Sequence, residues 1–355
     1  GALTVNSGAT ARFTNSHGFG VEPGGRAATI NGGTLQFDRE NYISSIAFTG
    51  GSLIGGEARF GSSKTINFNA AATGAVISSG MNLVGGTLTL NVADSAGVPV
   101  DLLVSGYINN VGSLIKSGTG FMKMSGSSTY SGTTTISAGT VQLASGSLGS
   151  GAVTVASAAT LAGSGNIAGV TTVIGQLTTG VDGAIGTLAF GGNLTLASTA
   201  ITTIKIAKSG GTLSKDVISS GGTLTCGGTL TVTAGGDTLA DGDTFRILPA
   251  TTLAGTFATV NLPALTGGLT WNTSRLYIDG TITVGNIPVL PTQTITFGTL
   301  PTLLVGDVLV LQATASSGLP VLYSSSNPAV ALIQYGDYLT TTGVGTTTIT
   351  ASQPG

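Results

Sequence analysis

Charged side chains are scarce in this sequence. Of its 355 residues 7% are Asp, Glu, Lys or Arg, against about 25% in an ordinary soluble domain. The chain has twelve Lys and Arg residues and fourteen Asp and Glu residues, so its formal net charge is -2. The Lys and Arg residues are scattered along the chain. A nucleic-acid-binding surface needs concentrated positive charge, so nucleic acid is excluded as a partner.

Cysteine, histidine and long apolar runs are also lacking. Cys226 is the one cysteine, so no internal disulfide can form, and we expect it to be a small buried apolar side chain. His17 is the one histidine, which removes most metal and acid–base chemistry. No apolar run reaches the ~18 residues of a membrane-spanning helix, so no membrane span is expected.

Aromatic residues make up 5% of the chain, whereas glycine fills 58 positions. The glycines do not recur at every third position, which excludes collagen. Disorder requires low hydropathy and high charge, but the mean hydropathy is +0.44 and 41% of residues are apolar. Thr, Ser, Val and Ile prevail among the remaining residues, and this composition predicts strands rather than helices.

A short turn-and-strand unit recurs along the chain. Period-two alternation follows many glycine pairs, as in residues 87–92, and indicates a strand with one face inward. A coil of about 20 residues cannot bury its own apolar face, so the pattern predicts an all-β solenoid whose coils stack. The tetrapeptide Gly-Gly-Thr-Leu occurs at 32–35, 85–88, 210–213, 221–224 and 227–230.

The composition divides the chain into four parts. Residues 1–238 are expected to form a parallel β-helix rod. Aromatics and prolines cluster in 239–285, which we interpret as antiparallel strands that cap the last coil and protect its edge. Residues 286–292 contain two prolines and indicate a stiff linker. Residues 293–355 show short strands separated by turns, which predicts a small β-sandwich.

One segment resembles a known family. Lys116, Gly118 and Gly120, followed by Tyr130 and Thr133, fall at the offsets of the autotransporter-associated β-strand repeat. The resemblance implies a right-handed parallel β-helix that is displayed at a bacterial surface or secreted outside the cell. One full copy of the motif is evident.

A second resemblance covers the C-terminal part. Segments 293–297, 315–321, 325–330 and 343–351 are similar to bacterial immunoglobulin-like repeats. The resemblance implies an immunoglobulin-like sandwich that acts as a spacer or adhesive module and carries no enzyme chemistry. The sequence stops before the last strand of the family pattern.

Candidate metal ligands are few. Asp237, Asp241 and Asp243 are the densest carboxylates and are weak calcium candidates. A calcium loop has more oxygen ligands at closer spacing, and Asp241-Gly242 is equally a turn signal. We therefore name no cofactor.

An enzyme is the remote alternative, because some parallel β-helices degrade polysaccharides. That chemistry needs paired carboxylates, and the isolated candidates Asp38, Glu40, Asp182 and Asp216 have no companion motif. The sequence therefore predicts a non-enzyme with no catalytic residues. Four aromatic residues are either sugar-stacking platforms or packing residues: Tyr107, Tyr130, Trp271 and Tyr277.

The expected function is structural: an extracellular scaffold or fibre subunit of a bacterial surface. Leu3 and Val5 lie in the first predicted strand, and Thr346 and Ile349 lie beside the missing strand of the sandwich. These edges suggest head-to-tail self-assembly by strand pairing or donation. Alternatively, both edges arise because the chain is cut from a longer protein. The rival function is an adhesin stalk that binds glycans or host surfaces.

Overall fold

A computed structural model describes residues 1–21, 25–285 and 294–353, and these residues form strands and no helix. They separate into two compact units, Gly1–Asn286 and Ile287–Gly355. The expected linker, 286–292, lies outside the described residues. Within the described part, no helix is long and apolar enough to cross a membrane.

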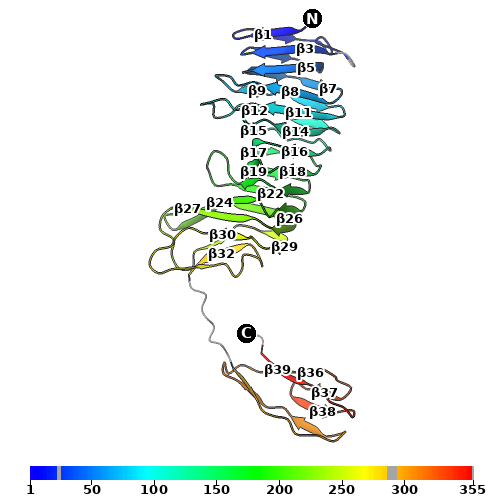
Figure 1. The fold of residues 1–355 in the computed structure, drawn as a ribbon, viewed down its shortest axis with the longest axis vertical. Helices are drawn as coiled ribbons and strands as arrows, with labels where there is room; N and C mark the ends of the chain where they lie inside the picture. Colours follow the sequence, from blue (N-terminus) through cyan, green and yellow to red (C-terminus); the bar gives the residue numbers. More distant parts are fainter. Residues whose placement is uncertain (22–24, 286–293, 354–355) are drawn as a thin grey trace. The chain divides into compact units, whose positions relative to one another are not determined.

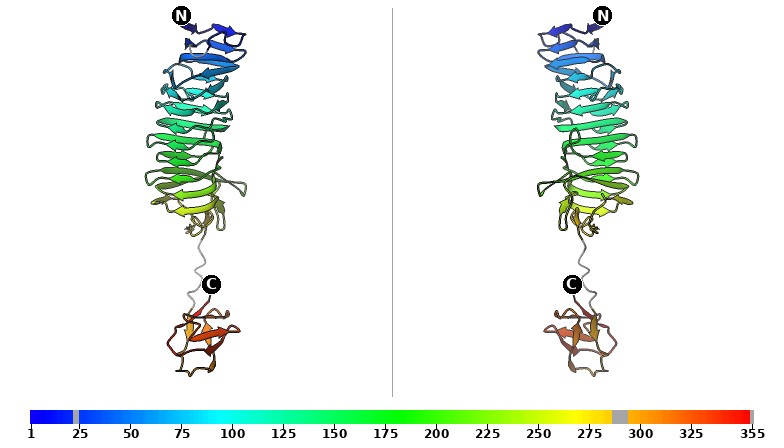
Figure 2. Two further views of the ribbon diagram at one scale, coloured as in Figure 1. Left: turned by 90° about the vertical axis from the view of Figure 1, so that its right-hand side faces the viewer. Right: turned by 90° about the vertical axis from the view of Figure 1, so that its left-hand side faces the viewer.

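Unit 1 is a parallel β-helix, which confirms the fold class predicted from the sequence (Figures 1 and 2). Each coil adds a strand to two long parallel ladders. The first ladder runs through β1 (Leu3–Asn6), β3 (Arg26–Asn31), β5 (Asn41–Thr49), β8 (Lys64–Phe68), β11 (Thr87–Val92), β14 (Ser113–Ser117), β16 (Thr134–Ile136), β18 (Val153–Val155), β20 (Thr171–Val173), β23 (Leu194–Leu196), β26 (Val217–Cys226) and β29 (Ala250–Gly255).

The second ladder occupies another side of each coil. It runs through β2 (Thr10–Phe13), β4 (Thr34–Phe37), β6 (Gly51–Gly55), β9 (Ala75–Ile77), β12 (Leu102–Val104), β15 (Phe121–Met124), β17 (Gly139–Ser147), β19 (Ala159–Ile167), β21 (Gln176–Thr178), β24 (Ile201–Ser209), β27 (Thr229–Gly236) and β30 (Thr259–Asn261).

A third, shorter ladder starts beside the first residues of β5. It contains β7 (Glu57–Phe60), β10 (Gly80–Leu83) and β13 (Ile108–Asn110). Further along the rod, β22 (Thr187–Phe190) lies between β19 and β26 and pairs parallel with both. One hairpin interrupts the parallel pattern, where β25 (Thr212–Lys215) pairs antiparallel with β24.

The core of unit 1 is a continuous apolar column. Period-two alternation turns every second side chain inward, so that Leu90 is fully buried while its neighbour Thr89 lies on the outer surface. Like residues stack between coils, and the rings of Phe48 and Phe68 lie 4.8 Å apart at paired positions. The column extends from Phe19 to Val284, so each coil buries its apolar surface against its neighbours.

Columns of glycine let the corners of successive coils approach closely. A Cβ atom on Gly132 would lie 2.2 Å from the carbonyl oxygen of Gly112 in the preceding coil. The same contact would be 2.1 Å for Gly151 against Gly132, and 1.8 Å for Gly169 against Gly151. No side chain fits there, because real Cβ atoms do not come so close to a backbone oxygen. The recurring glycines are therefore a steric requirement of the stacking.

The parallel helix extends beyond the boundary expected at residue 238. Strands β29 and β30 still pair parallel with β26 and β27, so the coil continues to Asn261. The antiparallel strands expected throughout 239–285 form only a three-stranded sheet of β28 (Thr244–Arg246), β32 (Thr281–Val284) and β31 (Trp271–Asn272). The aromatic residues of 239–285 do not mark a separate cap. Phe257 follows the parallel strand β29, and its ring packs against Tyr277 within the core of the helix.

Unit 2 consists of short antiparallel pairs. Its buried core is small, consisting of Leu311, Ala331 and Leu339, with partly buried apolar side chains around it. Its immunoglobulin-like family stays a prediction. The pairs are β33 (Ile295–Phe297) with β35 (Ala313–Ala315), β34 (Val308–Val310) with β38 (Tyr338–Thr341), β38 with β37 (Ala331–Gln334), and β36 (Leu322–Ser325) with β39 (Ile349–Ser352).

The glycine column makes a direct prediction. Gly132→Ala should lower the free energy of unfolding by about 1–3 kcal/mol, because the added methyl group forces two coils apart. Gly235→Ala is the matched control: a Cβ atom there meets nothing within 4 Å, so the expected change is within about 0.5 kcal/mol. Urea unfolding followed by circular dichroism measures both, and equal effects would contradict the steric account.

Candidate functional site

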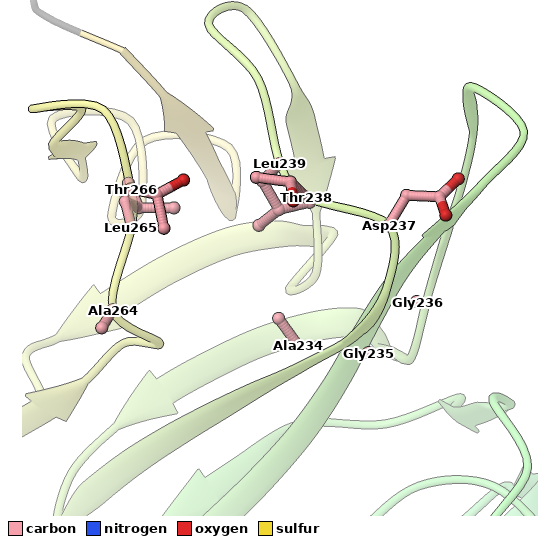
Figure 3. Close-up of a pocket in the computed structure, with 9 residues that line it drawn as sticks. All are labelled: Ala234, Gly235, Gly236, Asp237, Thr238, Leu239, Ala264, Leu265 and Thr266. Carbon is pink, nitrogen blue, oxygen red and sulfur yellow. The ribbon is translucent and has the colours of Figure 1, made fainter.

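The calcium candidates do not converge on one point. The Asp243 carboxylate pairs with Lys208 Nζ at 2.8 Å and accepts a hydrogen bond from the Ala240 amide. Asp237 accepts one from the Gly210 amide, and its carboxylate points away from Leu265 across the neighbouring 210 Å³ pocket (Figure 3). Among the residues that the structure describes, no three His, Cys, Asp or Glu side chains are grouped to hold a metal.

Each of the isolated acidic candidates is held by an ion pair or by hydrogen bonds. Asp38 is held by Arg12, and Asp182 pairs with Lys123 at 2.6 Å. Asp216 is fully buried, and its oxygens accept hydrogen bonds from the amides of Gly186 and Lys205, each at 2.7 Å. Asp38, Asp182 and Asp216 therefore occupy separate structural contacts. Glu40 differs, because it joins a larger cluster.

The four aromatic candidates range from buried to exposed, with Trp271 and Tyr277 partly buried. Tyr130 is fully buried and shares a 2.6 Å hydrogen bond with Thr134. Trp271 donates from Nε1 to the Pro263 carbonyl, and the Tyr277 hydroxyl accepts from the Phe257 amide, so both stabilise the end of unit 1. Tyr107 differs, because 43% of it is exposed. It is the most exposed of the four candidate platforms.

Tyr107 belongs to a polar cluster on the outer surface of the third ladder. Its ring lies over Gly80, where any Cβ atom would be 2.3 Å from the ring. The hydroxyl thereby reaches past one coil and donates to Glu57 Oε2 at 3.2 Å. Asn82 and Asn109 donate to the same carboxylate at 3.0 and 3.3 Å. We call this group, with Tyr42 and Arg59, the Tyr107 face.

Arg59 connects the Tyr107 face to Glu40. Its Nε donates to Glu57 Oε1 at 2.8 Å, and its Nη2 lies 2.6 Å from Glu40 Oε2. The guanidinium also lies over the ring of Tyr42, 5.8 Å from the centroid, and that ring stacks on His17. Tyr42, Arg59, Asn82 and Asn109 occupy one register column, so successive coils place them in a row.

The electrostatics of the Tyr107 face keep Glu57 ionised. Desolvation acts to raise the pKa of Glu57, but hydrogen bonds from Arg59, Asn82 and Asn109 outweigh it, and the pKa is lowered. Desolvation and the nearby Glu57 charge raise the pKa of Tyr107, so its hydroxyl stays protonated and can donate. Neutral pH thus leaves a carboxylate surrounded by donors.

Sequence reasoning did not find this cluster, although it considered Glu40 and Tyr107 singly. The members come from different coils, and Glu57 lies 25 residues before Asn82 and 52 before Asn109. The available signal was a polar residue recurring once per coil on one face. That signal is weak until the length of each coil is known.

Lys116 has an unexpected position for a charged residue. It fills an inward-facing place in the first ladder, between Leu90 and Ile136, and its side chain is completely buried. Nζ donates to the carbonyl oxygens of Gly118 at 2.7 Å and Ala138 at 2.9 Å. Lys116 therefore ties two glycine-rich turns of consecutive coils together.

Cys226 and the expected assembly edges have different surroundings. Cys226 is buried at an inward-facing position, as expected, and burial raises the pKa of its thiol to about 11. Val5 is buried, whereas Leu3 is half-buried, and both lie in β1, which within the described residues pairs with β3 alone. Thr346 and Ile349 line a pocket of 330 Å³ in unit 2.

One protein-family model matches the part of the chain that contains Lys116 and Tyr130. The family model of the passenger-associated-transport-repeat matches residues 114–143, which contain Lys116, Tyr130 and strands β14 to β16. The resemblance to the autotransporter-associated repeat is thereby confirmed. No curated protein and no solved structure matches the chain. Together, the repeat and the parallel β-helix indicate an autotransporter passenger-like surface protein.

The buried lysine predicts a pH dependence. Burial lowers the pKa of Lys116 from 10.5 to about 8, and the charge of Asp101 opposes this only in part. Below pH 8 the lysine is protonated in both states. Above it the folded state binds fewer protons than the unfolded state, so the free energy of unfolding should rise with pH. Urea unfolding between pH 8 and 9 measures the slope.

The control variant for this experiment is Lys116→Met, which should flatten the rise between pH 8 and 9. The window ends at pH 9 because the raised pKa of Cys226 gives an opposite slope above its ordinary value of 9.0. An unchanged slope in Lys116→Met would contradict the assignment.

Proposed function

We propose that this chain is an extracellular structural scaffold of a bacterial surface, with unit 1 as a stiff shaft. The observation that carries the proposal is the apolar column that connects the coils from Phe19 to Val284. Each interior coil is hydrogen-bonded to the coil before it and the coil after it, so bending the shaft costs contacts on both sides. Few charged residues interrupt this pattern.

We propose further that the chain is not an enzyme. Glycoside hydrolysis needs two carboxylates that face each other across the substrate. Glu40 and Glu57 lie in one cluster, but both bind Arg59. Glu57 has a lowered pKa and is unsuited to act as a general acid.

Self-assembly is the finer part of the scaffold proposal. β1 leaves one side of its backbone unpaired within the described residues, and its outward side chains carry no charge that would oppose strand pairing. Leu3 and Val5 belong to this edge, and Thr346 and Ile349 lie at the unit 2 pocket. Strand pairing between copies at these places stays a prediction.

The surface location can be tested by imaging. We expect antibodies against unit 1 to label the outside of intact cells that make the protein, and electron microscopy of shed material to show thin rods. Protease treatment of intact cells should remove the label. Label that appears only after the cells are broken would contradict the proposed location.

Self-assembly has its own test. Sedimentation velocity of the 355-residue chain should show species that grow with protein concentration. Thr4→Lys places a charge on the exposed side of β1 and should reduce the growth. Thr89→Lys, on the outer face of an interior strand, is the matched control and should leave it unchanged. A monomer at every concentration would rule out assembly by this chain.

The second candidate function is an adhesin stalk. The observation that favours it is the Tyr107 face, where an exposed aromatic ring lies beside several hydrogen-bonding groups. A shaft alone does not require this arrangement. The scaffold and adhesin roles are compatible, because a stiff rod can present a binding face away from the cell.

A further inference from the structure

The Tyr107 ring has a shape suited to a planar ligand. Gly80 has no side chain, so the ring of Tyr107 lies against the outer surface of β10. The hydrogen bond from its hydroxyl to Glu57 fixes that orientation. Because 43% of the residue is exposed, the ring offers a flat, electron-rich face beside the polar row.

The polar row supplies both donors and acceptors. Arg59 has five N–H donors, its side chain is 28% exposed, and its contacts with Glu57 and Glu40 involve Nε and Nη2. Glu40 is 35% exposed and accepts only. Asn82 is only 8% exposed, and its amide donates to Glu57 and accepts from Asn110. Asn109 also donates to Glu57. These two side chains therefore orient the Glu57 carboxylate, and Arg59 and Glu40 are the groups left for a ligand. The planar guanidinium and carboxylate groups of Arg59 and Glu40 can each hydrogen-bond to two neighbouring hydroxyl groups of a sugar.

The length of the row fits a short chain of sugars. Tyr42 stands at one end, and Asn109 with the adjacent Tyr107 stands three coils away. Parallel strands are spaced ~4.8 Å apart, which separates the two ends by roughly 14 Å. Tyr107 offers the open aromatic face at one end, whereas the Tyr42 ring at the other end lies under Arg59 and stacks on His17.

From this geometry we propose that the Tyr107 face binds a neutral oligosaccharide. The ring of Tyr107 stacks on the apolar face of one sugar, and Arg59 and Glu40 hydrogen-bond to hydroxyls of its neighbours. Two carboxylates against one guanidinium disfavour uronic acids, so the charge selects uncharged sugars. The inference rests on the adhesin role, and the shaft function does not depend on it.

The test is calorimetric titration of the full chain with cellotetraose and chitotetraose, with tetragalacturonate as the acidic comparison. We expect at least one neutral probe to bind and the acidic probe to bind more weakly. Tyr107→Ala should weaken binding about tenfold or more, which corresponds to the loss of one aromatic contact. Tyr107→Phe keeps the ring and should retain most of the affinity.

Tyr335→Ala is the matched control, because Tyr335 is 92% exposed and belongs to unit 2. Its affinity should equal that of the unmodified chain. Circular dichroism and thermal melting must show that each variant is folded. Failure of both neutral probes to bind the folded chain, equal affinity in Tyr107→Ala, or tighter binding of the acidic probe would each overturn the proposal. None of these results would bear on the rod images that test the shaft.

Discussion

The hydrogen-bonded stacking of one coil on the next is the constraint on which the rest of unit 1 depends. Parallel strands keep a fixed spacing of ~4.8 Å, so each position must suit the same position above and below it. At the corners this allows only glycine, as the contacts between Gly112, Gly132 and Gly151 show. On the outer surface it produces rows of like residues, and Thr135, Thr154, Thr172 and Thr195 occupy one register column. The unusual composition is thus a consequence of column geometry.

Lys116 shows how the same constraint tolerates a charge in the core. Its neighbours in the inward column are Leu90 and Ile136, and an unpaired ammonium group there would be costly. The charge is tolerated because the side chain extends to the turns, where Nζ donates hydrogen bonds to the carbonyl oxygens of Gly118 and Ala138. The aliphatic stem continues the apolar column and the amino group closes the corner. A lysine at this place in the matched repeat is therefore a structural residue.

The fold was predictable because its signals are local and repeated. Glycine corners and period-two alternation specify each coil, and the motif around Lys116 and Tyr130 identifies the repeat. The end of the rod was misplaced because residues 250–261 continue the parallel pairing within a segment of different composition. The Tyr107 face could not be predicted in the same way. Its contacts join residues 25 to 52 positions apart, and these separations depend on loops whose lengths follow no fixed rule.

The column geometry also bears on the proposed binding face. In a solenoid, one substitution changes a single row and leaves the remaining ladders intact, so an outer row can vary while the core is preserved. On the Tyr107 face, the missing side chain at Gly80 creates the space that the ring fills, and Glu57 two coils away orients it. The inward neighbours Ala58, Met81 and Ile108 remain buried beneath them. The apolar core and the proposed binding face therefore lie on opposite sides of the same strands.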